Sequence, residues 1–149
     1  MATEHKWEAP AAVQTYLSTE LNALADGGNK PGAAIDNQTD GTNDLYASLE
    51  LYLAAQGSAR DAGATVDVYL LPSVDGTNYC YGSDSDDPPA TAYVGSFVLD
   101  AATAARYATL HNLPVPPLRF KLLLVNNTGQ ALAAAGNTLK YRLHSLESQ

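Results

Sequence analysis

Cysteine is nearly absent from this 149-residue chain, which has only Cys80. A single thiol excludes an internal disulfide and any metal site built from several cysteines. The three histidines, His5, His111 and His144, are scattered along the chain, and no two of them have the spacing of metal ligands. We therefore expect no metal and no other cofactor.

Motifs of catalysis are missing as well. The sequence has no Gly-x-Ser-x-Gly elbow, and Cys80 has no evident histidine partner. Gly27-Gly28 is not followed by the Lys-Ser/Thr of a phosphate-binding loop. We predict that the chain is not an enzyme. The acidic residues of Asp84–Asp87 lack the glycine and the distant glutamate of an EF-hand, which favours a solvated loop over a calcium site.

Basic residues are few, and long apolar runs do not occur. Eight Lys and Arg stand against sixteen Asp and Glu, a net charge of −8, which argues against a nucleic-acid partner. The apolar stretches are short, for example Leu122–Val125, and none approaches the roughly 20 residues of a membrane span. The polar first residues do not have the apolar region of a secretory signal, so we expect synthesis in the cytoplasm and no membrane partner.

The charge that is present is unevenly distributed. Fifteen of the sixteen acidic residues lie in residues 1–100, whereas five of the eight basic residues lie in residues 101–149. Such asymmetry steers association between oppositely charged faces. An equally good interpretation is that the acidic loops only keep the protein soluble.

Apolar residues recur with a period of two from residue 33 onward, which predicts β-strands with one buried face. The clearest segment is Leu45–Leu53, where five apolar residues alternate with Tyr46, Ser48, Glu50 and Tyr52. About seven strands are predicted, near residues 33–36, 45–53, 65–70, 93–99, 105–110, 118–124 and 139–144. The segments between them are rich in turn residues, and no helical pattern intervenes. The fold class is therefore all-β, an antiparallel β-sandwich, and the long connection at residues 72–90 favours jelly-roll-like wiring.

The first 31 residues have a different pattern. Val13, Leu17, Leu21 and Leu24 recur at helical spacing, which predicts a short helix from about Ala11 to Leu24. The glycine-rich segment 26–32 would end this helix. We therefore predict an N-terminal arm or extension at residues 1–31 and a β-sandwich domain at residues 32–149.

Aromatic residues suggest one binding function. Tyr46 and Tyr52 share the outer face of a predicted strand, and Tyr79 and Tyr81 lie in a predicted loop. Exposed aromatic rings on a β-sandwich can stack on sugars or form a protein interface. The alternative is that a second layer, such as the N-terminal segment, covers Tyr46 and Tyr52.

Three strings carry a resemblance to a known family. Residues 18–24 (STELNAL), 69–79 (YLLPSVDGTNY) and 120–126 (FKLLLVN) resemble a group of small virion proteins of tailed bacteriophages, and the likeness extends from about Trp7 to Tyr141. The resemblance implies a capsid cement or decoration protein with a jelly-roll-like domain. Such a protein sits on the outer capsid surface of the virion, bridges major capsid protein subunits to stabilise the shell, and forms a dimer or trimer. It implies no catalytic residues.

Two functions are therefore expected, in order. The first is a structural virion protein that contacts the capsid through its N-terminal arm and its basic strands. The residues expected to make this contact are Trp7, Val13, Leu17, Arg119, Lys121, Lys140 and Arg142. The alternative is a carbohydrate-binding β-sandwich module for host attachment, which rests on the exposed tyrosines and on the loop from Asp75 to Asp87.

Overall fold

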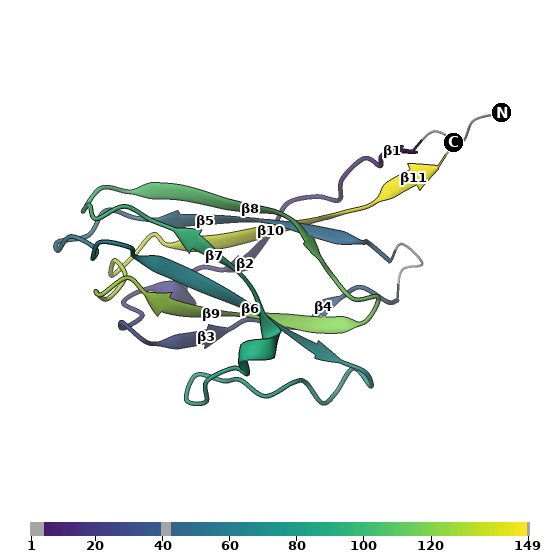
Figure 1. Cartoon of the computed structure of the whole chain (residues 1–149), viewed down its shortest axis with the longest axis horizontal. Coiled ribbons are helices and arrows are strands. Elements are labelled where there is room, and N and C mark those ends of the chain that lie inside the picture. Colours follow the sequence, from purple (N-terminus) through teal and green to yellow (C-terminus); the bar gives the residue numbers. More distant parts are fainter. Residues whose placement is uncertain (1–4, 40–42, 149) are drawn as a thin grey trace.

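The computed structural model describes residues 5–39 and 43–148 and shows two antiparallel β-sheets packed face to face (Figure 1). This confirms the predicted all-β antiparallel sandwich. In the described residues eleven strands are accompanied by two short 3₁₀ turns and no α-helix.

The first sheet has the strand order β2-β10-β5-β8, and the second has the order β3-β9-β6-β7, with β4 also paired to β9. The strands of the first sheet are β2 (Gln14–Leu17), β10 (Thr138–His144), β5 (Tyr46–Leu53) and β8 (Arg106–Pro114). Those of the second are β3 (Asn29–Pro31), β9 (Arg119–Asn127), β6 (Thr65–Ser73), β7 (Tyr93–Val98) and β4 (Ile35–Asp36). Because the chain passes repeatedly from one sheet to the other, the order is that of a double-sheet jelly roll.

The alternating pattern explains the packing. In β5 the residues Ala47, Leu49, Leu51 and Leu53 are all buried, while the residues between them are half-buried on the outer face. Phe120, Leu122 and Leu124 of β9 meet them from the second sheet in one continuous core. Burying a side chain of this size contributes about 1.5–3 kcal/mol, so the facing rows account for the sandwich.

The predicted N-terminal helix is wrong. Residues 11–24 instead contain β2, which pairs with β10, and a single 3₁₀ turn, η1 (Thr19–Leu21). Leu17 and Leu21 are both buried, but they reach the core from a strand and from a turn. The domain boundary predicted between residues 31 and 32 stays a prediction. Both β2 and β3 lie within the first 31 residues, and β2 belongs to the first sheet while β3 belongs to the second.

A small two-stranded ribbon joins the ends of the described chain. β1 (His5–Trp7) pairs with β11 (Leu146–Ser148), and the ribbon projects from one end of the sandwich (Figure 1). Lys6 and Glu147 form an ion pair across it at 3.0 Å. The ribbon places Trp7 beside the end of β10.

Within the described ranges, no helix is long and apolar enough to cross a membrane.

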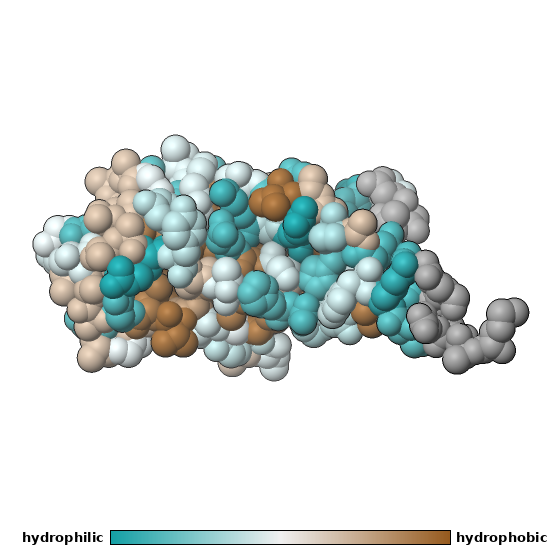
Figure 2. All heavy atoms as spheres, turned by 90° about the horizontal axis from the view of Figure 1, so that it is seen from above, coloured by the Kyte–Doolittle hydropathy of each residue, from teal (hydrophilic) through white to brown (hydrophobic). Residues whose placement is uncertain are grey.

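The two outer faces of the sandwich differ. On the second sheet, Leu71 and Leu123 point outward and are fully buried under residues 74–92, where Ala92 and Cys80 pack against them. Among the described residues, no comparable segment covers the middle of the first sheet. Figure 2 looks onto that face and shows hydrophilic residues spread across it, with only isolated hydrophobic spots.

Candidate binding groove on the first sheet

Strand pairing arranges the outward side chains of the first sheet in cross-strand rows. β5 lies between β10 and β8, and its outward residues Tyr46, Ser48, Glu50 and Tyr52 each stand in one row. From one end to the other the rows are Thr138/Tyr52/Tyr107, Lys140/Glu50/Thr109, Arg142/Ser48 and His144/Tyr46/Pro114.

The third row is completed by an irregularity in β8. The register of β5 and β8 shifts between Ala47 and Leu49, so that Ser48 faces both His111 and Asn112. Asn112 has φ of 55°, in the left-handed region that asparagine tolerates better than most residues. Such a bulge redirects a side chain, and here it leaves His111 exposed on the outer face.

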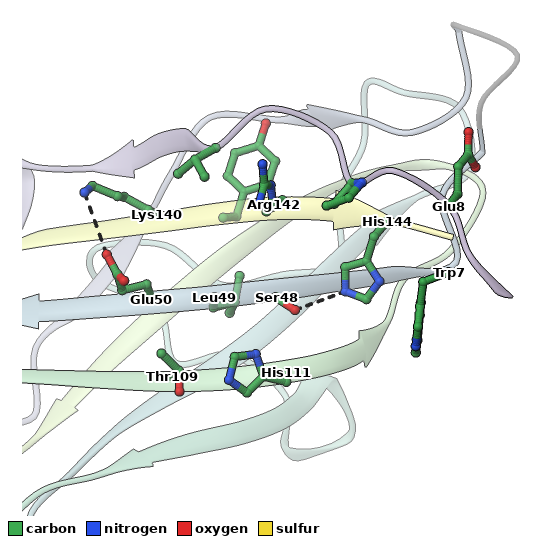
Figure 3. A pocket seen from close by; sticks show the side chains of 13 residues that line it. Trp7, Glu8, Ser48, Leu49, Glu50, Thr109, His111, Lys140, Arg142 and His144 are labelled. Atoms are coloured by element: carbon green, nitrogen blue, oxygen red, sulfur yellow. Dashed lines mark hydrogen bonds and ion pairs between the residues drawn. The ribbon is translucent and has the colours of Figure 1, made fainter. Parts of the chain in front are cut away.

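A groove of about 550 Å³ runs over the last three rows. Glu8, Pro10 and Val13 form one wall, and Trp7 lies at the end of the groove (Figure 3). Its floor and opposite wall come from β10, β5 and β8, and the outward residues among them are Lys140, Arg142, His144, Ser48, Glu50, Thr109 and His111.

Backbone hydrogen bonds to β10 and its end hold the N-terminal wall in place. The Glu8 amide donates to the Ser145 carbonyl and the Ala11 amide to the Leu143 carbonyl, both at 3.0 Å. Beyond these two bonds the pairing of β2 with β10 begins. The wall is therefore an extension of the sheet.

Aromatic rings gather where the groove meets the terminal ribbon. The Trp7 ring packs edge-on against Tyr46 and His144, with centroids 5.8 and 5.2 Å away, and Tyr46 stacks on His144 at 5.8 Å. Ser48 Oγ lies 3.0 Å from His144 Nε2. Burial lowers the pKa of His144 and so favours the neutral form of this imidazole. The side chain of Trp7 nevertheless remains 53% exposed.

A second aromatic pair lies at the other end of the same face. The rings of Tyr52 and Tyr107 stand 4.6 Å apart at an angle of 38°. Tyr107 is 68% exposed. The open face therefore has an aromatic cluster at each end and polar residues between them.

The polar residues in the middle carry both charges. Lys140 Nζ lies 3.7 Å from Glu50 Oε1, so these two side chains partly neutralise each other. Arg142 is exposed, and its Nε donates to the Ala11 carbonyl at 2.6 Å. Thr109 and His111 are exposed on β8. Such a surface offers both hydrogen-bond donors and hydrogen-bond acceptors.

Of the seven residues predicted to contact a partner, the groove brings four together. Trp7, Val13, Lys140 and Arg142 all line it. Leu17 is buried in the core and presents no surface.

Arg119 and Lys121 lie on the second sheet, on the other side of the molecule from Lys140 and Arg142. The guanidinium of Arg119 lies 2.8 Å from Asp36. Lys121 Nζ lies 4.4 Å from the centre of the Tyr79 ring. The four basic residues therefore do not form one surface.

The loop predicted as solvated or calcium-binding is tied to its surroundings by side chains. Asp84 forms an ion pair with Lys30 at 2.9 Å, and the Asp87 carboxylate accepts a hydrogen bond from the side-chain Nδ2 of Asn29 at 3.0 Å. Within residues 5–39 and 43–148, no group of three or more His, Cys, Asp or Glu side chains is placed to hold a metal ion.

Some residues of the groove were not predicted. In the sequence, His111 and His144 do not have the spacing of metal ligands, and Ser48 and Glu50 lie on the polar side of a predicted strand. None of them, nor Thr109, was assigned to a site. Their outward direction follows from the period-two pattern. Their gathering in one groove depends on the order of strands in the sheet, which local sequence does not contain.

No family model and no curated protein matches this sequence. Solved structures do match it. A CBM36-1 domain of a multidomain xylanase from the hindgut metagenome of Trinervitermes trinervoides is 12% identical, with a TM-score of 0.40, over 99% of this chain and 97% of that one. A family 6 carbohydrate-binding module from Clostridium cellulolyticum in complex with xylose is 13% identical, with a TM-score of 0.43, over 95% and 91%. A CBM36 module in complex with calcium and xylotriose is 14% identical, with a TM-score of 0.39, over 100% of both chains.

The prediction that the chain bridges major capsid subunits is not upheld: all three similar structures are carbohydrate-binding modules, which accords with the alternative prediction of a carbohydrate-binding β-sandwich module. A location on the virion surface, the likeness to tailed-phage proteins and a homo-oligomeric state stay predictions.

Proposed function

We propose that this chain is a non-catalytic carbohydrate-binding domain, which holds an extended glycan along the open face of the first sheet. The observation that carries the proposal is the arrangement of that face. Aromatic clusters at both ends flank a polar groove, and nothing among the described residues covers the middle.

The aromatic clusters suit the apolar faces of sugar rings. A pyranose ring presents C–H groups on its faces and hydroxyl groups around its edge. An exposed indole or phenol ring covers the C–H face and releases water from both surfaces. The Trp7 ring is held by its edge-on contacts with Tyr46 and His144. Its exposed surface is therefore oriented before a ligand binds, which reduces the conformational entropy lost on binding.

The polar middle suits the hydroxyl groups. Each sugar hydroxyl is both a donor and an acceptor, and the groove presents both kinds of partner: the Glu50 carboxylate accepts, Lys140 and Arg142 donate, and the Thr109 hydroxyl does either. Along β5 the distance from Tyr46 to Tyr52 is about 20 Å, from six strand steps. The face is therefore long enough for an oligosaccharide.

The decisive experiment uses Trp7, which is the only tryptophan of the chain. A panel of neutral and acidic oligosaccharides is titrated into the protein while tryptophan emission and the heat of binding are both recorded. We expect saturable binding that quenches or shifts the emission with the same dissociation constant as the calorimetric signal.

Two results would contradict the proposal. Absence of heat and emission change across the whole panel would remove the function. Calorimetric binding without any change in tryptophan emission, together with unchanged affinity after Trp7→Phe, would keep a carbohydrate ligand but place it outside the groove.

A further inference from the structure

We infer that the groove selects glycans that carry an anionic group, a carboxylate or a sulfate, and that Arg142 binds this group. The inference rests on the proposed function and names the class of its ligand. It goes against the overall charge of the protein, which is −8.

Arg142 differs from the other three arginines of the chain. Arg60 and Arg106 both pair with Asp100, at 3.2 and 2.5 Å, and Arg119 pairs with Asp36 at 2.8 Å. Among the described residues no carboxylate lies within ion-pair distance of Arg142. The chain has twice as many acidic as basic residues, yet this exposed arginine of the groove has no acidic partner among residues 5–39 and 43–148.

The guanidinium of Arg142 is also positioned. Its Nε donates to the Ala11 carbonyl at 2.6 Å. Ala11 is itself held by a backbone hydrogen bond, which its amide donates to the Leu143 carbonyl. The part of the chain that the structure describes provides no acceptor for the terminal nitrogens of Arg142. A guanidinium binds a carboxylate or sulfate through two parallel hydrogen bonds. Because one nitrogen is already anchored, less rotational freedom is lost when an anion binds.

The two acidic residues of the groove, Glu8 and Glu50, do not form an ion pair with Arg142. Glu50 is engaged by Lys140 in the neighbouring row. Figure 3 shows the Glu8 side chain near the end of the groove, apart from Arg142. Ser48 and His111 follow Arg142 across the sheet and offer hydrogen bonds to the hydroxyls of the same sugar.

The test compares sugars that differ only in charge. Oligogalacturonide and its methyl ester have the same backbone, and the ester removes the carboxylate charge. A sialylated oligosaccharide and a sulfated galactan oligosaccharide extend the acidic arm and separate carboxylate from sulfate. Each is titrated by calorimetry at several salt concentrations. We expect at least one acidic sugar to bind about tenfold more tightly than its uncharged counterpart, with an affinity that falls as salt rises.

The variants then assign the residue. Arg142→Gln should lower the affinity for the acidic sugar about tenfold and leave the affinity for the uncharged one within about twofold. Arg142→Lys should restore part of the loss, because it keeps the charge but not the paired donors. Lys121→Gln is the matched control. Lys121 lies on the opposite face, over the Tyr79 ring, and has no carboxylate partner among the described residues. This substitution should leave the affinity for every sugar unchanged.

The outcomes separate the two proposals. Equal affinity for charged and uncharged sugars, or acidic binding that Arg142→Gln leaves unchanged, would overturn this inference while the proposed function stands. Failure of every sugar to bind would overturn both. If Arg142→Gln does not fold, the salt dependence of the wild-type protein still decides, since binding of an anionic sugar that salt does not weaken contradicts a charge-selective groove.

Discussion

The two outer faces of the sandwich are built by the same alternation of residues but differ in what that alternation presents. The second sheet presents Leu71 and Leu123, and residues 74–92 bury both. The first sheet presents Ser48, Glu50 and Arg142 at its centre, and the described residues leave this centre open. The face that needs no cover is the one available for a ligand.

The cover of the second sheet is closely fitted. Gly82 has φ of +143°, and a Cβ atom there would lie 3.1 Å from a Leu123 methyl and 3.2 Å from a Leu71 methyl. Only glycine combines that backbone conformation with such a close approach. The Cys80 amide, which donates to the Pro72 carbonyl at 3.1 Å, adds a backbone tie to β6. The covered face is therefore a small second core.

The largest expected effect comes from breaking that second core. Leu123→Ala should lower the free energy of unfolding by about 2–5 kcal/mol, because Leu123 is fully buried between the sheet and its cover. Denaturant unfolding measures the loss. Thr109→Ala on the open face is the control and should change stability by less than about 0.5 kcal/mol. An equal loss from both substitutions would mean that the two faces do not differ.

The second effect concerns binding at the open face. Trp7→Ala should weaken glycan binding by about 2 kcal/mol, about 30-fold, because it removes the largest ring of the groove. Tyr93→Ala removes a ring of similar exposure, 47% against 53%, from the covered face. Calorimetry should show no loss of affinity for that control. A similar loss in both would indicate a general effect on the sandwich instead of a local binding site.

Much of this contrast could be predicted from the sequence. The alternation in residues 45–53 predicted which side chains of β5 point inward and which outward, and the burial pattern confirms it from Tyr46 onward. A strand with one buried face fixes the direction of every side chain, because a slip of one residue would exchange the two faces. The outward direction of Tyr46 and Tyr52 was predicted in this way.

Pairing between distant strands could not be predicted. β9 and β10 are consecutive in sequence, yet they belong to different sheets, so Lys121 and Lys140 lie on opposite faces. The predicted helix failed for a related reason. Leu17 and Leu21 are four residues apart as in a helix, but β2 ends between them and a 3₁₀ turn brings Leu21 to the same core. A helical period in a short segment does not exclude a strand followed by a turn.

The third prediction tests whether the open face binds beyond the groove itself. Tyr107→Ala should weaken binding of a long oligosaccharide by about 1 kcal/mol, roughly fivefold, and leave a disaccharide unaffected, because the Tyr52–Tyr107 pair lies at the far end of the face. Tyr81→Ala is matched in exposure, 66% against 68%, and lies in the cover. If both variants bind every sugar like the wild type, the binding site ends before this pair.

The smallest effect is a local response of the cover to acid. The Asp75 carboxylate accepts hydrogen bonds from the Asn78 and Thr77 amides at 2.7 and 2.8 Å and from the Asn78 side chain at 2.7 Å. The backbone bonds, that from Asn78 first, hold the pKa of Asp75 well below its ordinary value of 3.8. A carboxylate whose pKa is lowered in the folded protein stabilises the fold at pH values above its unfolded-state pKa. This stabilisation is lost as the pH falls through the folded-state pKa.

Below about pH 4, amide exchange in residues 74–92 should therefore rise before tryptophan emission reports any change at the groove. Asp75→Asn cannot ionise, so its cover should exchange faster at neutral pH and lose part of the acid response, while glycan affinity at pH 7 stays the same. The pKa of Asp36 is lowered to about 2 by hydrogen bonds from Thr39 and Gln38 and by Arg119. Both proteins contain this residue, so a difference between their acid responses reports Asp75. If amide exchange in residues 74–92 and tryptophan emission change at the same pH in both proteins, acid destabilises the whole sandwich and the two faces unfold as one unit.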